Sequence, residues 1–229
     1  MRVRARLRPR YTAFMDLQSV PKARPTLVHE RAALRDGHSV IAGVDEVGRG
    51  SWAGPVVAAA VILPLARRGL ARTLETVHDS KQLSPQQRSA AFDAIVAGGA
   101  LVSLGWASHH VIDRDGLAFA NRRAMCRAIA GLSTVPDIVL LDHFGLPECA
   151  LVQECITHGD AECLSIAAAS IVAKVFRDNW MNRCDRRFPG YGFSQHKGYG
   201  TAGHRAALAE LGISPLHRRS FGPIAAFAS

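Results

Sequence analysis

The chain has 229 residues, 48% of them hydrophobic and 7% aromatic, which is enough apolar material for the core of one large domain. Its 28 Lys and Arg outnumber 19 Asp and Glu, and the net charge of +9 favours a polyanionic partner, nucleic acid first and a membrane surface second. No apolar run reaches the roughly 18 residues of a membrane span, and no apolar stretch follows the basic start as in a signal peptide, so we expect a cytoplasmic protein. Five cysteines without a C-x-x-C pair argue against disulfides and a zinc site.

Residues 1–24 carry many arginines against one acid, Asp16, and show no sustained apolar period. This composition predicts a flexible basic tail, which either adds non-specific affinity for a polyanion or has no role. Met15 is an alternative start of the chain. From Pro25 the pattern changes, and we expect one ordered domain over residues 25–229.

The apolar pattern then predicts strands first and alternating strands and helices afterwards. A short helix over 27–34 leads into a strand over 40–44, and the β-branched stretch 55–63 is its expected hairpin partner. Ser84-Pro85 is an N-cap followed by a first-turn proline, and opens a helix that ends at Ala97. Further strands are expected over 102–106, 137–141 and 151–155, and further helices over 117–129, 161–183 and 201–211.

The helix over 161–183 is rich in alanine and contains neither Gly nor Pro, so we expect one continuous helix buried along one side. The order of all these elements predicts an α/β fold. Its mixed central β-sheet is flanked by helices, with a small C-terminal helical portion.

Asp45 and Glu46 follow the first apolar strand and directly precede Gly48-Arg49-Gly50. Two adjacent carboxylates at the rim of a buried strand are unfavourable unless a cation neutralises them, and Mg²⁺ or Mn²⁺ prefers such oxygen ligands. The glycines can bring backbone N–H groups, and Arg49 its guanidinium, against a phosphate or sugar. The alternative is a strand that ends in a tight turn with two solvated acids.

Two more acids have a similar setting. Asp142 follows the apolar run 138–141, and Asp160 opens the expected long helix. Taken singly, Asp160 is explained by an N-cap and Asp142 by a solvated strand end. Together with Asp45 and Glu46 they could form a cluster that holds two divalent cations, which would align an attacking water and stabilise the leaving oxygen of a phosphodiester.

Basic and aromatic residues suggest contacts to nucleic acid. Lys81 lies in a polar loop before a capped helix and is a candidate phosphate contact, or simply a solvated lysine. Tyr199 is flanked by glycines and follows Lys197, so its ring could stack on a sugar or base while its neighbours meet phosphates; a partly buried core tyrosine is the alternative. The cluster His217-Arg218-Arg219 is either a phosphate contact or a solvated turn.

Taken together, these segments resemble bacterial ribonuclease HII, the type 2 ribonuclease H family. The matching stretches occur in the family's order and are 43–63, 79–88, 140–142, 159–178, 191–201 and 217–221. The resemblance implies a ribonuclease H-like fold over residues 25–229. It also implies cleavage of the RNA strand of RNA–DNA hybrids and incision on the 5′ side of single ribonucleotides in duplex DNA, which leaves 3′-hydroxyl and 5′-phosphate ends and serves ribonucleotide removal.

The resemblance also implies roles for particular residues. Asp45, Glu46, Asp142 and Asp160 would hold two Mg²⁺ or Mn²⁺ ions, with Asp45 bridging both. The backbone of Gly48-Arg49-Gly50 would sense the ribose 2′-hydroxyl, and Tyr199 would read the RNA–DNA junction. We expect a monomer; a sliding-clamp contact stays open.

The chain departs from the usual family pattern at a few places, which are Ser51 and Trp52 for Pro-Leu, His143 for Gly, His158 for Lys and Glu162-Cys163 for pairs such as Lys-Ser. The rival functions are a ribonuclease HIII, for which the basic tail is too short to supply the extra N-terminal domain, and a non-catalytic nucleic-acid-binding module. The retention of all four acids argues against the module, because acids repel phosphate.

Overall fold

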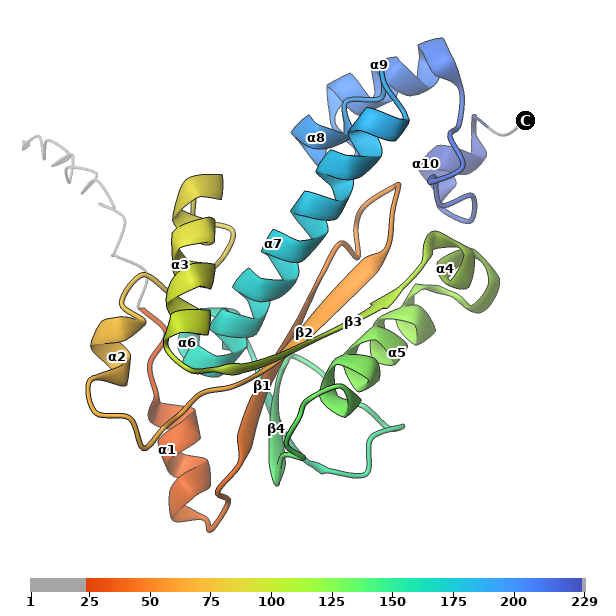
Figure 1. Cartoon of the computed structure of the whole chain (residues 1–229). Helices are drawn as coiled ribbons and strands as arrows, with labels where there is room; N and C mark the ends of the chain where they lie inside the picture. Colours follow the sequence, from red (N-terminus) through yellow and green to blue (C-terminus); the bar gives the residue numbers. More distant parts are fainter. Residues whose placement is uncertain (1–23, 228–229) are drawn as a thin grey trace, which may run out of the picture.

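One mixed β-sheet forms the centre of the molecule, and helices cover both of its faces (Figure 1). The computed structural model describes residues 24–227, so the tail predicted for residues 1–24, including Met15, lies outside the described residues except for Arg24. The strands have the order β3-β2-β1-β4-β5. Their bounds are β1 Ile41–Val47, β2 Val56–Ile62, β3 Leu101–Ala107, β4 Ile138–Asp142 and β5 Val152–Ile156. Because β1 is antiparallel to β2 and parallel to β4, the carboxyl ends of β1 and β4 lie together.

The main helices and all five strands agree with the predicted ranges to within a few residues. The α/β architecture with its C-terminal helical portion is thereby confirmed. The Ser84 side chain caps α3 by accepting a hydrogen bond from the Gln87 amide. The short helices α2, α4, α8 and α10 were not predicted, because they are too brief to show a period. The helix bounds are α1 Val28–Arg35, α2 Leu70–Thr73, α3 Pro85–Ala97, α4 His109–Asp115, α5 Leu117–Ala130, α6 Gly159–Glu162, α7 Leu164–Arg187, α8 Phe193–His196, α9 Ala202–Leu211 and α10 Gly222–Ala225.

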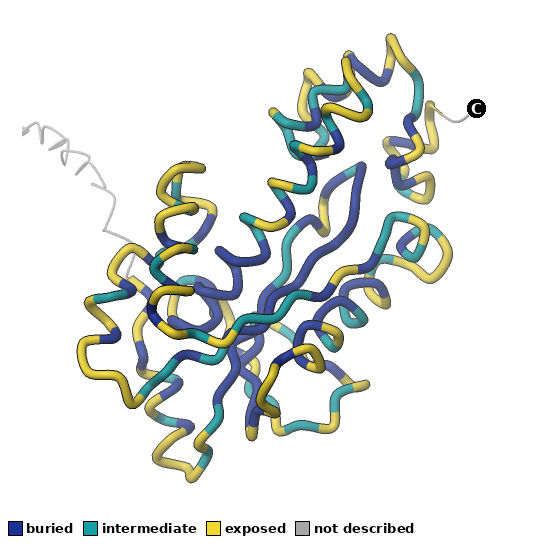
Figure 2. The backbone as a smooth tube through the Cα atoms, viewed as in Figure 1, coloured by how far each residue is buried: buried dark blue, intermediate teal, exposed yellow. Residues whose placement is uncertain are grey.

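Helix α7 packs against β1 and β2 on one face of the sheet, and α5 packs against β2 and β3 on the other (Figure 1). The backbones approach closely at Gly43 of β1, where a Cβ atom would lie 2.2 Å from the Ser165 carbonyl carbon. Glycine at this position therefore lets the first turn of α7 lie directly over β1. Residues Leu164–Ala173 are buried on all sides, whereas the later turns of α7 are only partly buried (Figure 2).

The prediction of one continuous helix over 161–183 was wrong. The chain has an extended backbone at Cys163, and α6 ends before it while α7 begins after it and continues to Arg187. Glu30 of α1 supplies an acceptor that a preceding helical turn would otherwise provide. Its Oε1 accepts hydrogen bonds from the Ser165 amide at 2.7 Å and from Cys163 Sγ at 3.2 Å. Asp160 thus lies inside the separate helix α6. The alternative that Asp160 is the N-cap of the long helix is wrong.

Helices α8 and α9 lie at the far end of α7, α10 lies close to α4, and together they form the C-terminal helical portion (Figure 1). Its small apolar cluster joins Met181 and Cys184 of α7 to Ala53, Phe193 and Leu216. All five cysteines are free thiols, in agreement with the prediction. Within residues 24–227, no helix combines the length and the apolar character needed to cross a membrane.

Candidate active site

Four acidic side chains lie close together: Asp45 and Glu46 in the second half of β1, Asp142 at the end of β4, and Asp160 in the short helix α6. The parallel register pairs Val44 of β1 with Leu141 of β4, so Asp45 and Asp142 are neighbours one residue further on. The Gly159 amide donates to Asp142 Oδ1 at 2.8 Å and thereby brings α6, with Asp160, against the end of β4. The predicted convergence of these acids is what the fold produces, and parallel pairing is its cause.

The pocket at this place has a volume of about 670 Å³. Asp45, Glu46 and Asp142 line it together with Gly48, Arg49, Gly50, Lys81 and Tyr199. Asp160 is 7% exposed and borders it through Lys81, whose Nζ donates to Asp160 Oδ2 at 2.9 Å. Eight of the ten residues predicted for the site therefore line one pocket, and Lys81 connects Asp160 to it.

Burial makes this acidic cluster electrostatically unfavourable without a cation. It raises the pKa of Asp45 well above its ordinary value, and the charges of Glu46 and Asp142 add to the effect. Burial also raises the pKa of Glu46, against the opposing charge of Arg49. The pKa of Asp142 is raised by burial as well, although the Gly159 amide partly compensates.

The donor set fits a hard divalent cation, since it consists of carboxylate oxygens that need positive charge. As they stand, however, no three His, Cys, Asp or Glu side chains within residues 24–227 are grouped as ligands of one ion. Cations of the chain hold two of the acids instead, Lys81 with Asp160 and Arg49 with Glu46 at 3.2 Å. The Lys81 side chain is 77% exposed, so it can leave Asp160 at little cost.

The turn Gly48-Arg49-Gly50 has a conformation that requires glycine at its first position, where φ is +90°. The Ser51 amide donates to the Gly48 carbonyl at 3.4 Å, a bond that the proline usual in the family cannot make. The Trp52 amide donates to the Gly198 carbonyl at 2.7 Å and so ties the turn to the loop of Tyr199. The serine at position 51 therefore adds a bond that closes the turn, whereas the Trp52 bond comes from the backbone and does not depend on the side chain at that position.

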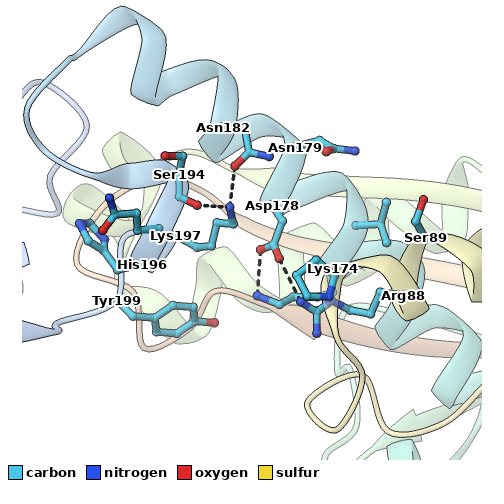
Figure 3. Close-up of a pocket in the computed structure, with 13 residues that line it drawn as sticks. Arg88, Ser89, Lys174, Asp178, Asn179, Asn182, Ser194, His196, Lys197 and Tyr199 are labelled. Carbon is cyan, nitrogen blue, oxygen red and sulfur yellow. Dashed lines mark hydrogen bonds and ion pairs between the residues drawn. The ribbon is translucent and has the colours of Figure 1, made fainter.

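Tyr199 lies between the acidic pocket and a second pocket of about 410 Å³ formed by α3, α7 and α8 (Figure 3). Its ring lies 5.8 Å from Lys174 Nζ and 5.6 Å from the Arg177 guanidinium carbon. Lys197 lines the second pocket only, and its ammonium donates to Asn182 Oδ1 and to the Ser194 carbonyl (Figure 3). Lys197 is therefore not brought to the carboxylates, and its contact with a phosphate stays a prediction.

The basic cluster His217-Arg218-Arg219 was interpreted too simply. His217 and Arg218 are 1% and 0% exposed, so for these two residues neither a phosphate contact nor a solvated turn is correct; only Arg219 is exposed. Sequence reasoning also missed Arg177, which is 0% exposed. No local pattern distinguishes a buried arginine from a solvated one, because its burial depends on backbone carbonyls supplied by distant segments.

His143 and His158 both have left-handed backbone conformations, with φ of +72° and +58°. This conformation is unfavourable by about 1 kcal/mol or more for a residue with a side chain, and glycine avoids that strain. The family's usual glycine at position 143 is thus explained by the backbone, and both histidine side chains are exposed.

The chain is similar to known proteins in both sequence and fold. The family model for ribonuclease HII matches residues 42–223. The ribonuclease HII of Herpetosiphon aurantiacus is 49% identical over 201 residues, which are 87% of this chain and 97% of that protein. Among solved structures, the ribonuclease H2 of Pyrococcus horikoshii OT3 superposes with a TM-score of 0.70 at 22% identity, over 82% of this chain and 97% of that one.

A second solved structure, Bst-RNase HIII in complex with Mn²⁺, has a TM-score of 0.61 at 19% identity, over 93% of this chain and 74% of that one. At these identities both structures support the fold, which is that of the ribonucleases H. Membership of a family is instead supported by the family model, which matches most of the chain, and by the relative from Herpetosiphon aurantiacus, which is 49% identical over 87% of it. The chain therefore belongs to the ribonuclease HII family, whose members are ribonuclease H enzymes.

Proposed function

We propose that this ribonuclease H cleaves the RNA strand of RNA–DNA hybrids and incises duplex DNA on the 5′ side of single ribonucleotides, with two divalent metal ions at the four acids. The observation that carries this proposal is the shared pocket: the buried Asp45 and the half-buried Asp142 line it together with the glycine turn and Tyr199. A metal-binding group and groups suited to a ribose and to a base thus face the same space.

The acids Asp45, Glu46, Asp142 and Asp160 would hold the ions. When bound, such ions activate a water and stabilise the charge on the leaving oxygen. Lys81 and Arg49 neutralise two of these acids in the metal-free protein, and their cationic groups are then available to the scissile phosphate.

Selection of RNA over DNA depends on the 2′-hydroxyl, the group that differs between them. The exposed backbone of Arg49 and Gly50 offers N–H donors at the pocket. The net charge of +9 supports binding of the polyanionic duplex.

The test is incubation of the protein with Mg²⁺ or Mn²⁺ and a duplex DNA that contains one ribonucleotide. We expect one cut on its 5′ side, with 3′-hydroxyl and 5′-phosphate ends. The same duplex without the ribonucleotide is the control and should stay intact. Binding of the ribonucleotide duplex without any cut, with both metals, would contradict the enzymatic proposal and favour the binding-module alternative.

Tyr199→Ala should lower incision at a single ribonucleotide about tenfold, and cleavage of long hybrids much less. The reason is that stacking of one base on an aromatic ring contributes about 1–3 kcal/mol, and only the single-ribonucleotide substrate has an RNA–DNA junction at every site. Initial rates on both substrates measure the effect. Tyr199→Phe is the matched control, since it keeps the ring and should retain most of the junction preference. An equal loss on both substrates in Tyr199→Ala would contradict a junction-reading role.

A further inference from the structure

Two buried arginines, which form no ion pair within the part of the chain that the structure describes, support the glycine turn. Arg177 of α7 and Arg218 are both 0% exposed. None of the ion pairs within residues 24–227 includes either of them. Burying a guanidinium without a counter-charge is unfavourable, so this arrangement requires an unusually complete set of hydrogen bonds.

Backbone carbonyls of the turn supply those bonds. Arg218 donates from Nη2 to the Gly48 carbonyl and from Nη1 to the Arg49 carbonyl, both at 2.7 Å, and from Nε to the Gly54 carbonyl at 3.0 Å. Its own amide donates to the Trp52 carbonyl at 2.7 Å. The Arg218 guanidinium thus binds both the beginning and the end of the loop between β1 and β2.

Arg177 binds the same loop from the side of α7. It donates to the carbonyls of Ala53, Pro55 and Lys197. Its side chain also lies so close beneath Gly48 that a Cβ atom there would be 2.2 Å from Arg177 Nε. The Lys197 bond connects this support to the loop that carries Tyr199.

The carbonyl bonds of Arg218 determine where the amides of the turn point. In a trans peptide, the carbonyl of one residue and the N–H of the next point in opposite directions. Because Arg218 holds the Gly48 and Arg49 carbonyls inward, the N–H groups of Arg49 and Gly50 point away from it. Neither amide donates to another residue of the described chain, and both residues are exposed at the acidic pocket.

We propose that Arg218 is the positioning residue for ribose recognition: it orients the Arg49 and Gly50 amides toward the 2′-hydroxyl of the substrate. This inference rests on the proposed function, in which the glycine turn senses that hydroxyl. Arg218 itself does not touch the nucleic acid, since it is wholly buried. Lysine cannot replace it, because a single ammonium lacks the flat fork of donors that holds three carbonyls at once.

The experiment measures binding in an Asp45→Asn background, so that no cleavage interferes. Fluorescence anisotropy gives the Kd for two duplexes of the same sequence, one with a single ribonucleotide and one all DNA, in the presence of Mg²⁺. We expect the parent to prefer the ribonucleotide duplex about tenfold, the factor that corresponds to one hydrogen bond of about 1.4 kcal/mol. Adding Arg218→Lys should reduce this preference to about twofold or less and leave the Kd for the all-DNA duplex unchanged.

Arg219→Lys is the matched control, because it makes the same chemical change at the adjacent, exposed position. It should keep the full preference. If Arg218→Lys keeps the preference, or weakens binding of both duplexes equally, the positioning role is wrong. If the parent itself shows no preference, the proposed function of the turn fails instead, so the two failures are distinguishable.

A measurement on the chain with native Arg218 covers the case in which Arg218→Lys does not fold. In the Asp45→Asn protein, the NMR signals of the Arg49 and Gly50 amides should shift more with the ribonucleotide duplex than with the all-DNA duplex. Identical shifts with both duplexes would contradict the contact between these amides and the 2′-hydroxyl, which the role of Arg218 requires.

Discussion

Asp45→Asn is expected to abolish cleavage and at the same time to raise the thermal stability of the metal-free protein. Cleavage should fall at least about 1000-fold, which corresponds to a loss of about 4 kcal/mol of transition-state stabilisation by the metal site. Stability should rise because the ionised Asp45 is buried among other acids, and asparagine removes its charge while keeping its shape.

The sign follows from the raised pKa of Asp45. A carboxyl whose pKa is higher in the folded state binds protons more readily there. It therefore destabilises the fold progressively as the pH rises above the pKa that the carboxyl has in the unfolded chain. At neutral pH the substitution removes this penalty. We expect the Tm of the metal-free protein to increase by about 2–4 °C, the shift that 1 kcal/mol produces in a protein of this size.

Differential scanning calorimetry with and without Mg²⁺ or Mn²⁺ checks the stability effect. Either metal should raise the Tm of the native protein, because it binds the folded state, and should raise that of Asp45→Asn much less. Asp93→Asn, an exposed position on α3, is the control and should change neither Tm nor activity.

Asp142→Asn should also lose cleavage, although its Oδ1 can still accept the hydrogen bond from the Gly159 amide. Native activity in either site variant would contradict the metal cluster.

Acidification is expected to destabilise the protein strongly through two buried histidines of the C-terminal helical portion. His204 and His217 are 0% and 1% exposed, and their Nε2 atoms lie 2.9 Å apart. The Ser214 amide donates to His217 Nδ1, so the proton of His217 is on Nε2 and is donated to His204. His204 then carries its proton on Nδ1 and donates it to the Tyr199 carbonyl at 3.0 Å.

This hydrogen-bonded chain requires both rings to be neutral, and burial lowers the pKa of each to about 4. Above a pH of about 6.5 the rings are neutral in the folded and the unfolded chain, and stability is complete. Between pH 6.5 and 4 the unfolded chain takes up protons that the folded chain excludes, so stability falls. The expected loss is on the order of 3 kcal/mol for one histidine and levels off below about pH 4.

Urea unfolding at a series of pH values between 7.5 and 4 measures this loss. The buried acids of the site act in the opposite sense, so the comparison is made between variants. His204→Asn should have a smaller pH slope than the native protein, because one proton uptake is removed and the asparagine amide can still donate to Tyr199. His158→Asn, at an exposed position, should leave the slope unchanged. An unaltered slope in His204→Asn would mean that this ring does not control acid stability.

Local chain chemistry was sufficient to predict the sheet, the main helices and the group of acids around Asp45 and Asp142. The reason is that these features depend on neighbours in the sequence: apolar strands that end in carboxylates bring their acids together once the strands pair in parallel. The glycine turn was recognisable too, since only glycine adopts its φ of +90° freely.

Long-range packing decided the rest. The break at Cys163 depends on Glu30, which is far away in the sequence, and an alanine-rich segment shows no sign of it. Likewise, the residues next to Arg218 in the sequence are equally compatible with an exposed cation. It became the support of the glycine turn only because the fold places the carbonyls of Gly48 and Arg49 around its guanidinium and excludes water from them. A buried charge takes its role from the partners that tertiary structure supplies, and no sequence period encodes them.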